Sequence, residues 1–308
     1  MFLSERYSCN MQQVTPVAQV HWRSTVSAYI NLMKPHVTVL LLGTTLAAMT
    51  VASPSGLSLG LVVATLTGGA LAAGSANALN CYIDRDIDQI MTRTRSRSLP
   101  AHRLPETHAL AFGILLGIAS FSVLYTFVGS LSAFLALGAI LFYVLVYTLM
   151  LKRTTPQNIV IGGAAGAVPV LVGWAAATQH VGLPAMWMFL IIFLWTPPHF
   201  WALSLVLKRD YERAHVPMLP VVAGEVETYR QIILYTLLLL AASLMLYVTH
   251  TLGIFYVVVA SALGMGLLVF AIILSVKRTL KLARMVFWFS NYYLALLFAA
   301  MVVDHLFR

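Results

Sequence analysis

The stretch Asn80-Cys-Tyr-Ile-Asp84-Arg-Asp-Ile-Asp88 closes a long apolar run and is followed by arginines at positions 93, 95 and 97. Each four-residue step advances about 400° around a helix, so Asn80, Asp84 and Asp88 are predicted to line one helix face over roughly two turns. Carboxylate and amide oxygens suit Mg²⁺, which proteins usually hold with one or two carboxylates plus substrate phosphates. An acidic face beside arginines therefore indicates a site for a metal–diphosphate substrate.

The rest of the chain is too apolar for a soluble domain. Of its 308 residues, 60% are hydrophobic and 9% are charged, whereas soluble domains carry about 25% charged residues. This composition predicts an all-α, polytopic membrane protein. Nine stretches are long enough, or nearly so, to cross a hydrocarbon layer about 30 Å thick. They fall at 34–53, 57–82, 107–128, 131–150, 157–178, 184–207, 231–250, 253–275 and 285–306.

The distribution of basic residues predicts the orientation of these spans. Of the 19 Lys and Arg residues, 18 lie in the N-terminal segment up to Lys34 or in the second, fourth, sixth and eighth connections, and the other is Arg308. The odd-numbered connections contain none. The positive-inside rule then places the N-terminus inside and the C-terminus outside. It also accounts for the net charge of +9 without nucleic acid as a partner.

The N-terminal segment and the two cysteines bear on the domain bounds, the membrane location and the possible disulfides. Residues 1–28 are polar and mixed, and we expect a cytosolic N-terminal arm there, with 29–308 as a single nine-helix domain. A mitochondrial presequence, and with it the mitochondrial inner membrane, is disfavoured by Glu5 and by the low arginine density. We expect a bacterial cell (inner) membrane with the active site facing the cytoplasm. Cys9 and Cys81 have no paired spacing, so neither a disulfide nor a thiolate metal site is indicated.

Two inner connections stand out by their length and polarity. They run over 89–106 and 208–229 on the same predicted membrane face, and we expect them to form a lid over a cavity that opens inward. The second includes Lys208-Arg-Asp210-Tyr-Glu212, four spans after the first acidic motif, which suggests an internal duplication. Asp210 would then carry a second Mg²⁺ or share the first.

Each of these signals also has a plainer explanation. A helix end that emerges into water carries acids without any metal, and the positive-inside rule alone puts Arg93 and Arg97 in an inner loop, where lipid phosphate would suit them. We favour metal and diphosphate binding because Asn80 and Asp84 lie inward of the interface on a shared face. Lys152-Arg153 is a weaker signal, since it is an isolated pair.

The run Trp195-Thr-Pro-Pro-His199-Phe-Trp201 is predicted to break the sixth span about eight residues, or ~12 Å, from its inner end. The carbonyls freed by the prolines need partners in the protein or around a cavity. His199 is either such a partner or a ligand, and its aromatic neighbours favour a flat, apolar substrate. In the fifth span, Gly162 and Gly166 form a small-xxx-small pattern that allows close helix packing.

Taken together, these motifs resemble those of the UbiA-type intramembrane prenyltransferases over roughly residues 28–306. The Asn80-x-x-x-Asp84-x-x-x-Asp88 motif marks that superfamily. Other runs are similar to its haem-farnesylating branch. They are Lys34-Pro35, Met91-x-Arg93-Thr94-x-x-Arg97-x-Leu99-Pro100, Tyr147-x-x-x-Leu151-Lys152-Arg153, Thr155-Pro-Gln-Asn-Ile-Val-Ile-Gly-Gly163, Thr196-Pro-Pro-His-Phe-Trp201 and Asp210-Tyr211-x-x-Ala214-x-x-Pro217-Met-Leu-Pro220.

The resemblance implies that Asn80, Asp84 and Asp88 bind Mg²⁺–farnesyl diphosphate, and it places the second acidic motif at Asp210. It implies farnesyl transfer to a vinyl group of haem B, giving haem O and diphosphate, in contact with membrane lipid. A haem-handling or terminal-oxidase assembly protein is the further partner it suggests. The residues it implies for substrate contacts are Lys34, His36, Arg93, Arg97, Lys152, Arg153, His199 and Lys208.

The chain departs from the family pattern at two positions. Ala214 stands where the second acidic motif often has another acid, which puts the second metal in doubt. His36 stands where members often have arginine, so either a diphosphate contact is weakened or a haem contact is gained.

Two other functions remain open at this point. The same chemistry on an aromatic acceptor such as 4-hydroxybenzoate shares the acidic motifs, and only the runs of the haem branch argue against it. A membrane transporter or lipid-binding protein would suit a broken sixth span and an internal repeat. Such a protein has no evident use for an acidic face with an arginine loop.

Overall fold

The computed structural model describes residues 22–53 and 56–307, and within them every regular element is a helix. This part of the chain holds nine helices that are long and apolar enough to cross a membrane, which confirms the predicted number of spans. They are α2 (Pro35–Ala52), α3 (Leu59–Ile83), α5 (Glu106–Phe127), α6 (Ser130–Leu141) with its continuation η1 (Phe142–Leu151), α7 (Asn158–Thr178), α8 (Leu183–Val206), α11 (Gly224–Val248), α12 (Ile254–Lys277) and α13 (Leu280–Leu306).

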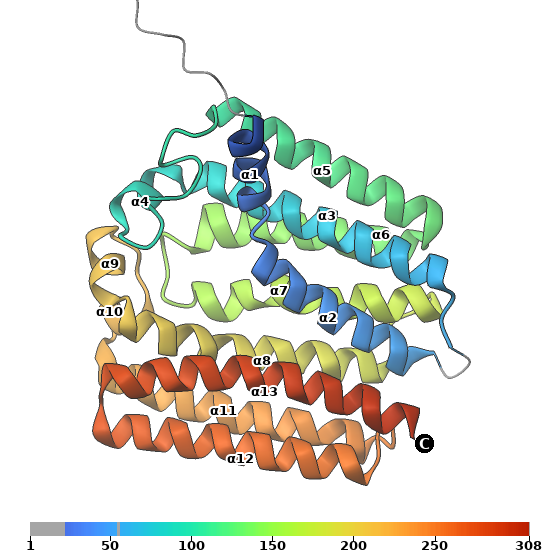
Figure 1. Ribbon diagram of the computed structural model, residues 1–308. Coiled ribbons are helices and arrows are strands. Elements are labelled where there is room, and N and C mark those ends of the chain that lie inside the picture. The colour runs from blue at the N-terminus through green and yellow to red at the C-terminus, as the bar shows by residue number, and fades with distance from the viewer. Residues whose placement is uncertain (1–21, 54–55, 308) are drawn as a thin grey trace, which may run out of the picture.

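The spans pack as two groups of helices with a seam between them (Figure 1). In the C-terminal group, α8, α11, α12 and α13 form a ring in which each helix contacts the next. In the N-terminal group, α3, α5 and α6 pack on one another. The seam consists of α2 and α7, which contact each other and join the two groups.

Four short helices lie outside the spans: α1 (Trp22–Leu32), α4 (Arg85–Ile90), α9 (Lys208–Arg213) and α10 (Leu219–Val222). In Figure 1, α4, α9 and α10 occupy one end of the bundle, and the C-terminus lies at the opposite end. The two long polar connections are therefore on the same end of the molecule, as their positions in the sequence predicted. In both groups a long span is followed at once by a six-residue helix, α4 after α3 and α9 after α8.

Two spans begin earlier than hydropathy predicts. Helix α11 begins at Gly224 and α13 at Leu280, whereas the apolar stretches begin at 231 and 285. The first turns of α11 carry Glu225 and Glu227. A hydropathy pattern reports where a helix meets lipid, and the backbone continues as a helix into the polar region beyond it.

The expected break in the sixth span is wrong. Helix α8 runs without interruption from Leu183 to Val206 and includes Pro197 and Pro198. A proline removes the hydrogen bond to the carbonyl four residues earlier and crowds that carbonyl, here those of Phe193 and Leu194. Since α8 is the most buried of the spans described and packs against α7, α11 and α13, its neighbours hold the remaining turns in place.

The expected N-terminal arm lies mostly outside the described residues, which begin at residue 22. Helix α1 crosses the boundary expected at residue 28, so the structured part of the chain begins before the predicted domain does.

Candidate active site

The acidic motif is built at the junction of two helices. Helix α3 ends at Ile83 and α4 begins at Arg85, so the single helix expected over the motif is interrupted at Asp84, where φ is −86° and ψ is 5°. The Asp84 N–H still donates to the Asn80 carbonyl at 2.9 Å, and the Asp84 carbonyl accepts from the Asp88 N–H at 2.8 Å. This continued bonding keeps the three side chains on successive turns despite the bend.

Asp84 is fully buried at the centre of the site. Its Oδ2 accepts a hydrogen bond from Asn80 Nδ2 at 2.6 Å and one from Lys152 Nζ. Its Oδ1 has no hydrogen-bond partner, and Arg153 Nη2 lies 3.8 Å from it. An unpaired, buried carboxylate oxygen is costly, so this atom is an obvious position for a cation to bind.

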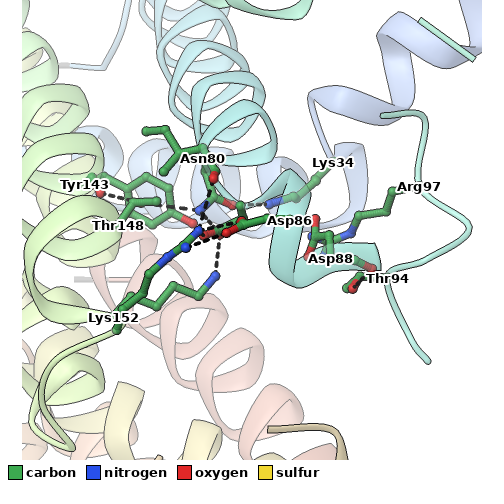
Figure 2. Close-up of polar contacts among 12 residues, drawn as sticks. Lys34, Asn80, Asp86, Asp88, Thr94, Arg97, Tyr143, Thr148 and Lys152 are labelled. Atoms are coloured by element: carbon green, nitrogen blue, oxygen red, sulfur yellow. Dashed lines mark hydrogen bonds and ion pairs between the residues drawn. The ribbon is translucent and has the colours of Figure 1, made fainter. Parts of the chain in front are cut away.

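Asn80 links the acid to two other elements (Figure 2). Its Oδ1 accepts from Lys34 Nζ at 2.9 Å, and its Nδ2 lies 3.3 Å from Thr148 Oγ1 of η1. Lys34 joins α1 to α2 in the left-handed region, with φ 50° and ψ 65°, a conformation that costs free energy for a residue with a side chain. Burial, and then the charges of Arg97 and Lys152, lower the pKa of the Lys34 ammonium. Its partner is only a neutral amide, so its positive charge remains available to an anion.

Asp88 forms a second ion pair beside this cluster. Its Oδ2 accepts from Arg97 Nη1 at 2.7 Å, and its backbone carbonyl accepts from Thr94 Oγ1 at 3.0 Å (Figure 2). The loop thus folds back so that a predicted diphosphate-binding arginine meets a predicted metal-binding acid. Each of Asn80, Asp84 and Asp88 is therefore paired with a basic side chain.

A π-helical segment, η1, presents Thr148 and Lys152 to Asn80 and Asp84. In a π-helix the hydrogen bonds run between residues five apart, and such segments are frequent at functional sites. Here the Lys152 N–H donates to the Tyr147 carbonyl at 2.8 Å, and Thr148 Oγ1 donates to the Tyr143 carbonyl at 2.8 Å. Sequence reasoning missed Thr148 and this segment. No spacing in the sequence distinguishes such a segment from an α-helix.

Arg153 stands on the flank of the site. Its guanidinium donates to both carboxylate oxygens of Asp86, at 2.6 and 2.7 Å, and these bonds hold the pKa of the Asp86 carboxyl below its usual value. The two side chains border a hollow of about 390 Å³, which Ile83, Arg85 and Leu149 also line.

The second acidic motif meets the first through the loops. Thr92 Oγ1 donates to Asp210 Oδ1 at 3.0 Å, and Arg213 lies 3.9 Å from the same oxygen. Apolar side chains from α4, the two loops and α7 bury one another, namely Ile87, Met91, Ile159, Tyr211, Ala214, Val216 and Met218. The two connections expected to form a lid are thus packed together.

Helix α1 packs against the loop that carries Arg93, Arg95 and Arg97. Its Ala28 and Leu32 are buried against Leu99 and Leu104 of the loop, and Ser98 Oγ donates to the Ala28 carbonyl at 3.1 Å. Cys81 is a free thiol in the same apolar cluster, where it packs as a small residue.

Other predicted residues lie apart from this cluster. Lys208 Nζ pairs with Glu225 of α11 at 3.1 Å. His36 and Arg93 are exposed at the same end, and neither forms a hydrogen bond or ion pair with the rest of the described chain. His199 is buried in α8 and bonds to Ser290 of α13 at 2.7 Å. The close packing predicted for the Gly162 and Gly166 pattern holds only at Gly162, where a Cβ would overlap the Tyr147 ring. Gly166 has open space beside it, so the prediction is wrong there.

The donor set fits Mg²⁺ in part. Two carboxylates and an amide supply hard oxygens, and one of those oxygens has no partner. Within the described residues no three His, Cys, Asp or Glu side chains gather closely enough to hold a metal ion alone. Phosphate oxygens or water would have to complete the coordination, which is how proteins usually hold Mg²⁺.

This membrane-embedded helical fold, with carboxylates and cations gathered at one end, is that of an intramembrane prenyltransferase. The UbiA prenyltransferase family model matches residues 41–300, so the chain belongs to the UbiA prenyltransferase family. It is therefore an integral membrane enzyme that transfers prenyl groups, and the resemblance noted in its motifs is confirmed.

Within that family its curated relatives are protoheme IX farnesyltransferases. The one from Gloeobacter violaceus is 51% identical over 285 residues, covering 92% of this chain and 93% of the relative. The one from Synechocystis sp. is 52% identical over 281 residues, covering 91% of this chain and 89% of the relative.

Solved structures share the fold. A digeranylgeranylglyceryl phosphate synthase superposes with a TM-score of 0.77 at 17% identity, covering 92% of this chain and 99% of that one. A UbiA homologue from Archaeoglobus fulgidus bound to GPP and Mg²⁺ gives a TM-score of 0.62 at 16% identity, covering 89% and 99%.

Proposed function

We propose that the chain transfers the farnesyl group of farnesyl diphosphate to a vinyl group of haem B, giving haem O and diphosphate. The observation that carries this proposal is the identity of about half of all residues, over nine tenths of the chain, to protoheme IX farnesyltransferases. The matched regions span about nine tenths of this chain, so they cover the helices proposed to bind donor and acceptor.

Asn80, Asp84 and Asp88 would hold Mg²⁺ together with the diphosphate oxygens, and Asp210 would support a second ion or share the first. Bound there, Mg²⁺ supplies charge neutralisation of the leaving diphosphate. The unpaired Asp84 Oδ1 supports this assignment, because a buried carboxylate oxygen without a donor is stabilised by a cation.

The basic residues at the site have a second role in this proposal. Lys34, Lys152 and Arg97 are paired with Asn80, Asp84 and Asp88 respectively. A diphosphate carries more negative charge than these partners, so the same three side chains are close enough to turn toward it and neutralise it. Arg93 has no partner in the described chain and would bind the diphosphate from the exposed side.

The transfer itself follows from this charge arrangement. The allylic C–O bond of farnesyl diphosphate breaks, diphosphate takes the electron pair, and the resonance-stabilised farnesyl cation adds to the vinyl carbon of haem B. Water then adds to the adjacent carbon and loses a proton, which leaves the hydroxyl of the product. The apolar spans around the site exclude water until that step.

The same observations disfavour the alternatives. An aromatic acceptor such as 4-hydroxybenzoate would suit the acidic site equally well, but the relatives at about half identity are named for protohaem. Transport or passive lipid binding leaves the acidic and basic cluster without a purpose in a member of a prenyltransferase family.

Competition between acceptors tests the proposal. Membranes containing the chain are given labelled farnesyl diphosphate, Mg²⁺ and equal amounts of haem B and 4-hydroxybenzoate. We expect the label in a haem fraction that is retained longer on a reversed-phase column. Label in the benzoate alone would replace haem B with an aromatic acceptor.

The membrane location is part of the proposal. The relatives named above are bacterial, and nearly all basic residues of the chain lie in or next to the even-numbered connections or in the N-terminal segment. A bacterial cell membrane with the site facing the cytoplasm follows from the positive-inside rule.

A further inference from the structure

His199 does not serve the backbone that the prolines disrupt. Pro197 and Pro198 free the carbonyls of Phe193 and Leu194, which lie more than one turn before His199 on α8. The His199 ring instead bonds across the helix interface to Ser290 of α13, with 2.7 Å between Nδ1 and Oγ. Its position therefore needs another explanation.

The imidazole of His199 is fixed on both of its faces. The Trp195 ring stacks on one side at 4.3 Å between centroids, and the Phe287 ring stacks on the other at 4.5 Å. Phe200 meets it edge-on at 5.6 Å. Ser290 also holds Trp195, because its backbone carbonyl accepts from the indole Nε1 at 2.7 Å. One residue of α13 thus orients both rings.

The hydrogen bonds of Ser290 determine which imidazole nitrogen carries the proton. A hydroxyl has one proton to donate, and Ser290 Oγ donates it to the Phe287 carbonyl at 2.7 Å, since a carbonyl only accepts. Oγ must then accept from His199, so Nδ1 carries the N–H of the neutral ring. Nε2 then keeps its lone pair.

We propose that Ser290 is a positioning residue, which holds His199 in the Nδ1–H form so that Nε2 coordinates the iron of the haem substrate. The inference rests on the proposed function, since it takes haem B as the acceptor. Histidines that bind metals almost always donate their other N–H to an oxygen acceptor, which fixes the tautomer and the ring orientation. The Ser290–His199 pair has this arrangement, and the imidazole itself fills the space between the Trp195 and Phe287 rings.

The test is a titration of the full-length chain in lipid nanodiscs with haem B, followed by the Soret band. We expect the wild type to shift the band and His199→Gly to lose the shift. Added imidazole should restore it by filling the slot between Trp195 and Phe287. Ser290→Ala should raise the dissociation constant for haem B about 10- to 100-fold, the usual cost of removing a residue that orients a metal ligand. Ser290→Thr keeps the hydroxyl and should recover most of that affinity.

Ser243→Ala is the matched control. Ser243 is as fully buried as Ser290 and also bonds to a ring residue, with Oγ 2.7 Å from the Tyr293 hydroxyl, but it does not contact His199. We expect its haem affinity to equal that of the wild type.

Three results would overturn the inference. If His199→Gly shows an unchanged Soret shift and wild-type farnesyl transfer to haem, His199 is not the iron ligand, and the proposed function is unaffected. Equal losses of affinity in Ser290→Ala and Ser243→Ala reduce Ser290 to a packing residue. If the wild type binds no haem B at all, the proposed function fails together with this inference.

Discussion

At this site, metal-binding and diphosphate-binding side chains contact one another. Each predicted metal ligand already contacts a basic side chain, and one carboxylate oxygen of Asp84 has no hydrogen-bond partner. The amide and the two acids are thus arranged for a cation, and the lysines and arginine beside them for an anion. A metal–diphosphate substrate satisfies both sets at once, which is why these residue types occur together.

Removing one charge from the acidic cluster should stop turnover without unfolding the protein. Asp84→Asn and Asp88→Asn keep the side-chain shape but remove an anionic ligand, and we expect the turnover number to fall about 100-fold or more. The assay is haem O formation at saturating Mg²⁺, with membrane insertion checked by protease protection. Asp86→Asn, an exposed acid between the two, should retain most of the activity. Near-normal turnover in both buried variants would show that the metal binds elsewhere.

Lys34 should act mainly on the prenyl donor. The Lys34 ammonium donates a hydrogen bond only to the neutral Asn80 amide. Its positive charge is therefore not neutralised there and can attract a bound diphosphate. Lys34→Gln should raise the KM for farnesyl diphosphate about 10- to 100-fold, the scale of one hydrogen bond to a charged group. The KM for haem B should change little. Lys281→Gln, at an exposed position on α13, is the control. Equal changes in both KM values would assign Lys34 a structural role.

The sequence predicts those site residues that stand at a recognisable spacing in a motif. Four-residue steps identified Asn80, Asp84 and Asp88, and the second motif identified Asp210. It could not predict that Lys208 turns to Glu225, because both partners lie in polar segments without periodicity. Ser290 was missed as well, since a lone serine in an apolar span has no pattern around it and its role depends on a contact with another helix.

At the level of elements, hydropathy located the spans and missed their irregularities. The acidic helix bends at Asp84, the fourth span ends as a π-helix, and the prolines leave α8 intact. Hydropathy averages over many residues and carries no information on whether successive hydrogen bonds span four residues or five. The outcome at each irregularity depends on packing: α8 has neighbours on several sides that hold its turns in place.

The contact between α7 and η1 can be tested with a pair of glycines. A Cβ at position 162 would overlap the Tyr147 ring, so Gly162→Ala must displace η1 and with it Lys152. We expect a loss of about 1–3 kcal/mol in stability, typical of overpacking, and a clear loss of activity. Gly166→Ala, one turn further along α7, has open space and should be tolerated. Thermal unfolding in detergent measures both, and equal behaviour would contradict the packing argument.

On the scale of the whole molecule, the bundle brings both acidic motifs to one end and leaves the C-terminus at the other (Figure 1). The charge distribution predicts that the acidic end faces the cytoplasm. A phosphatase active only outside the cytoplasm, fused after α13, should therefore be active, and the same fusion after α12 should be inactive. The opposite pattern would reverse the proposed orientation and place the diphosphate site outside the cell.

The most direct measurement gives the purified chain haem B and farnesyl diphosphate, with Mg²⁺ or with excess chelator, and determines the mass of the haem product. The expected product is haem B with one farnesyl group and one hydroxyl group added, formed with Mg²⁺, absent with chelator and restored by Mg²⁺ or Mn²⁺, because oxygen ligands favour these ions. A haem of unchanged mass under all conditions, or full conversion in excess chelator, would contradict the central claim that the acidic face holds a metal–diphosphate for transfer to haem.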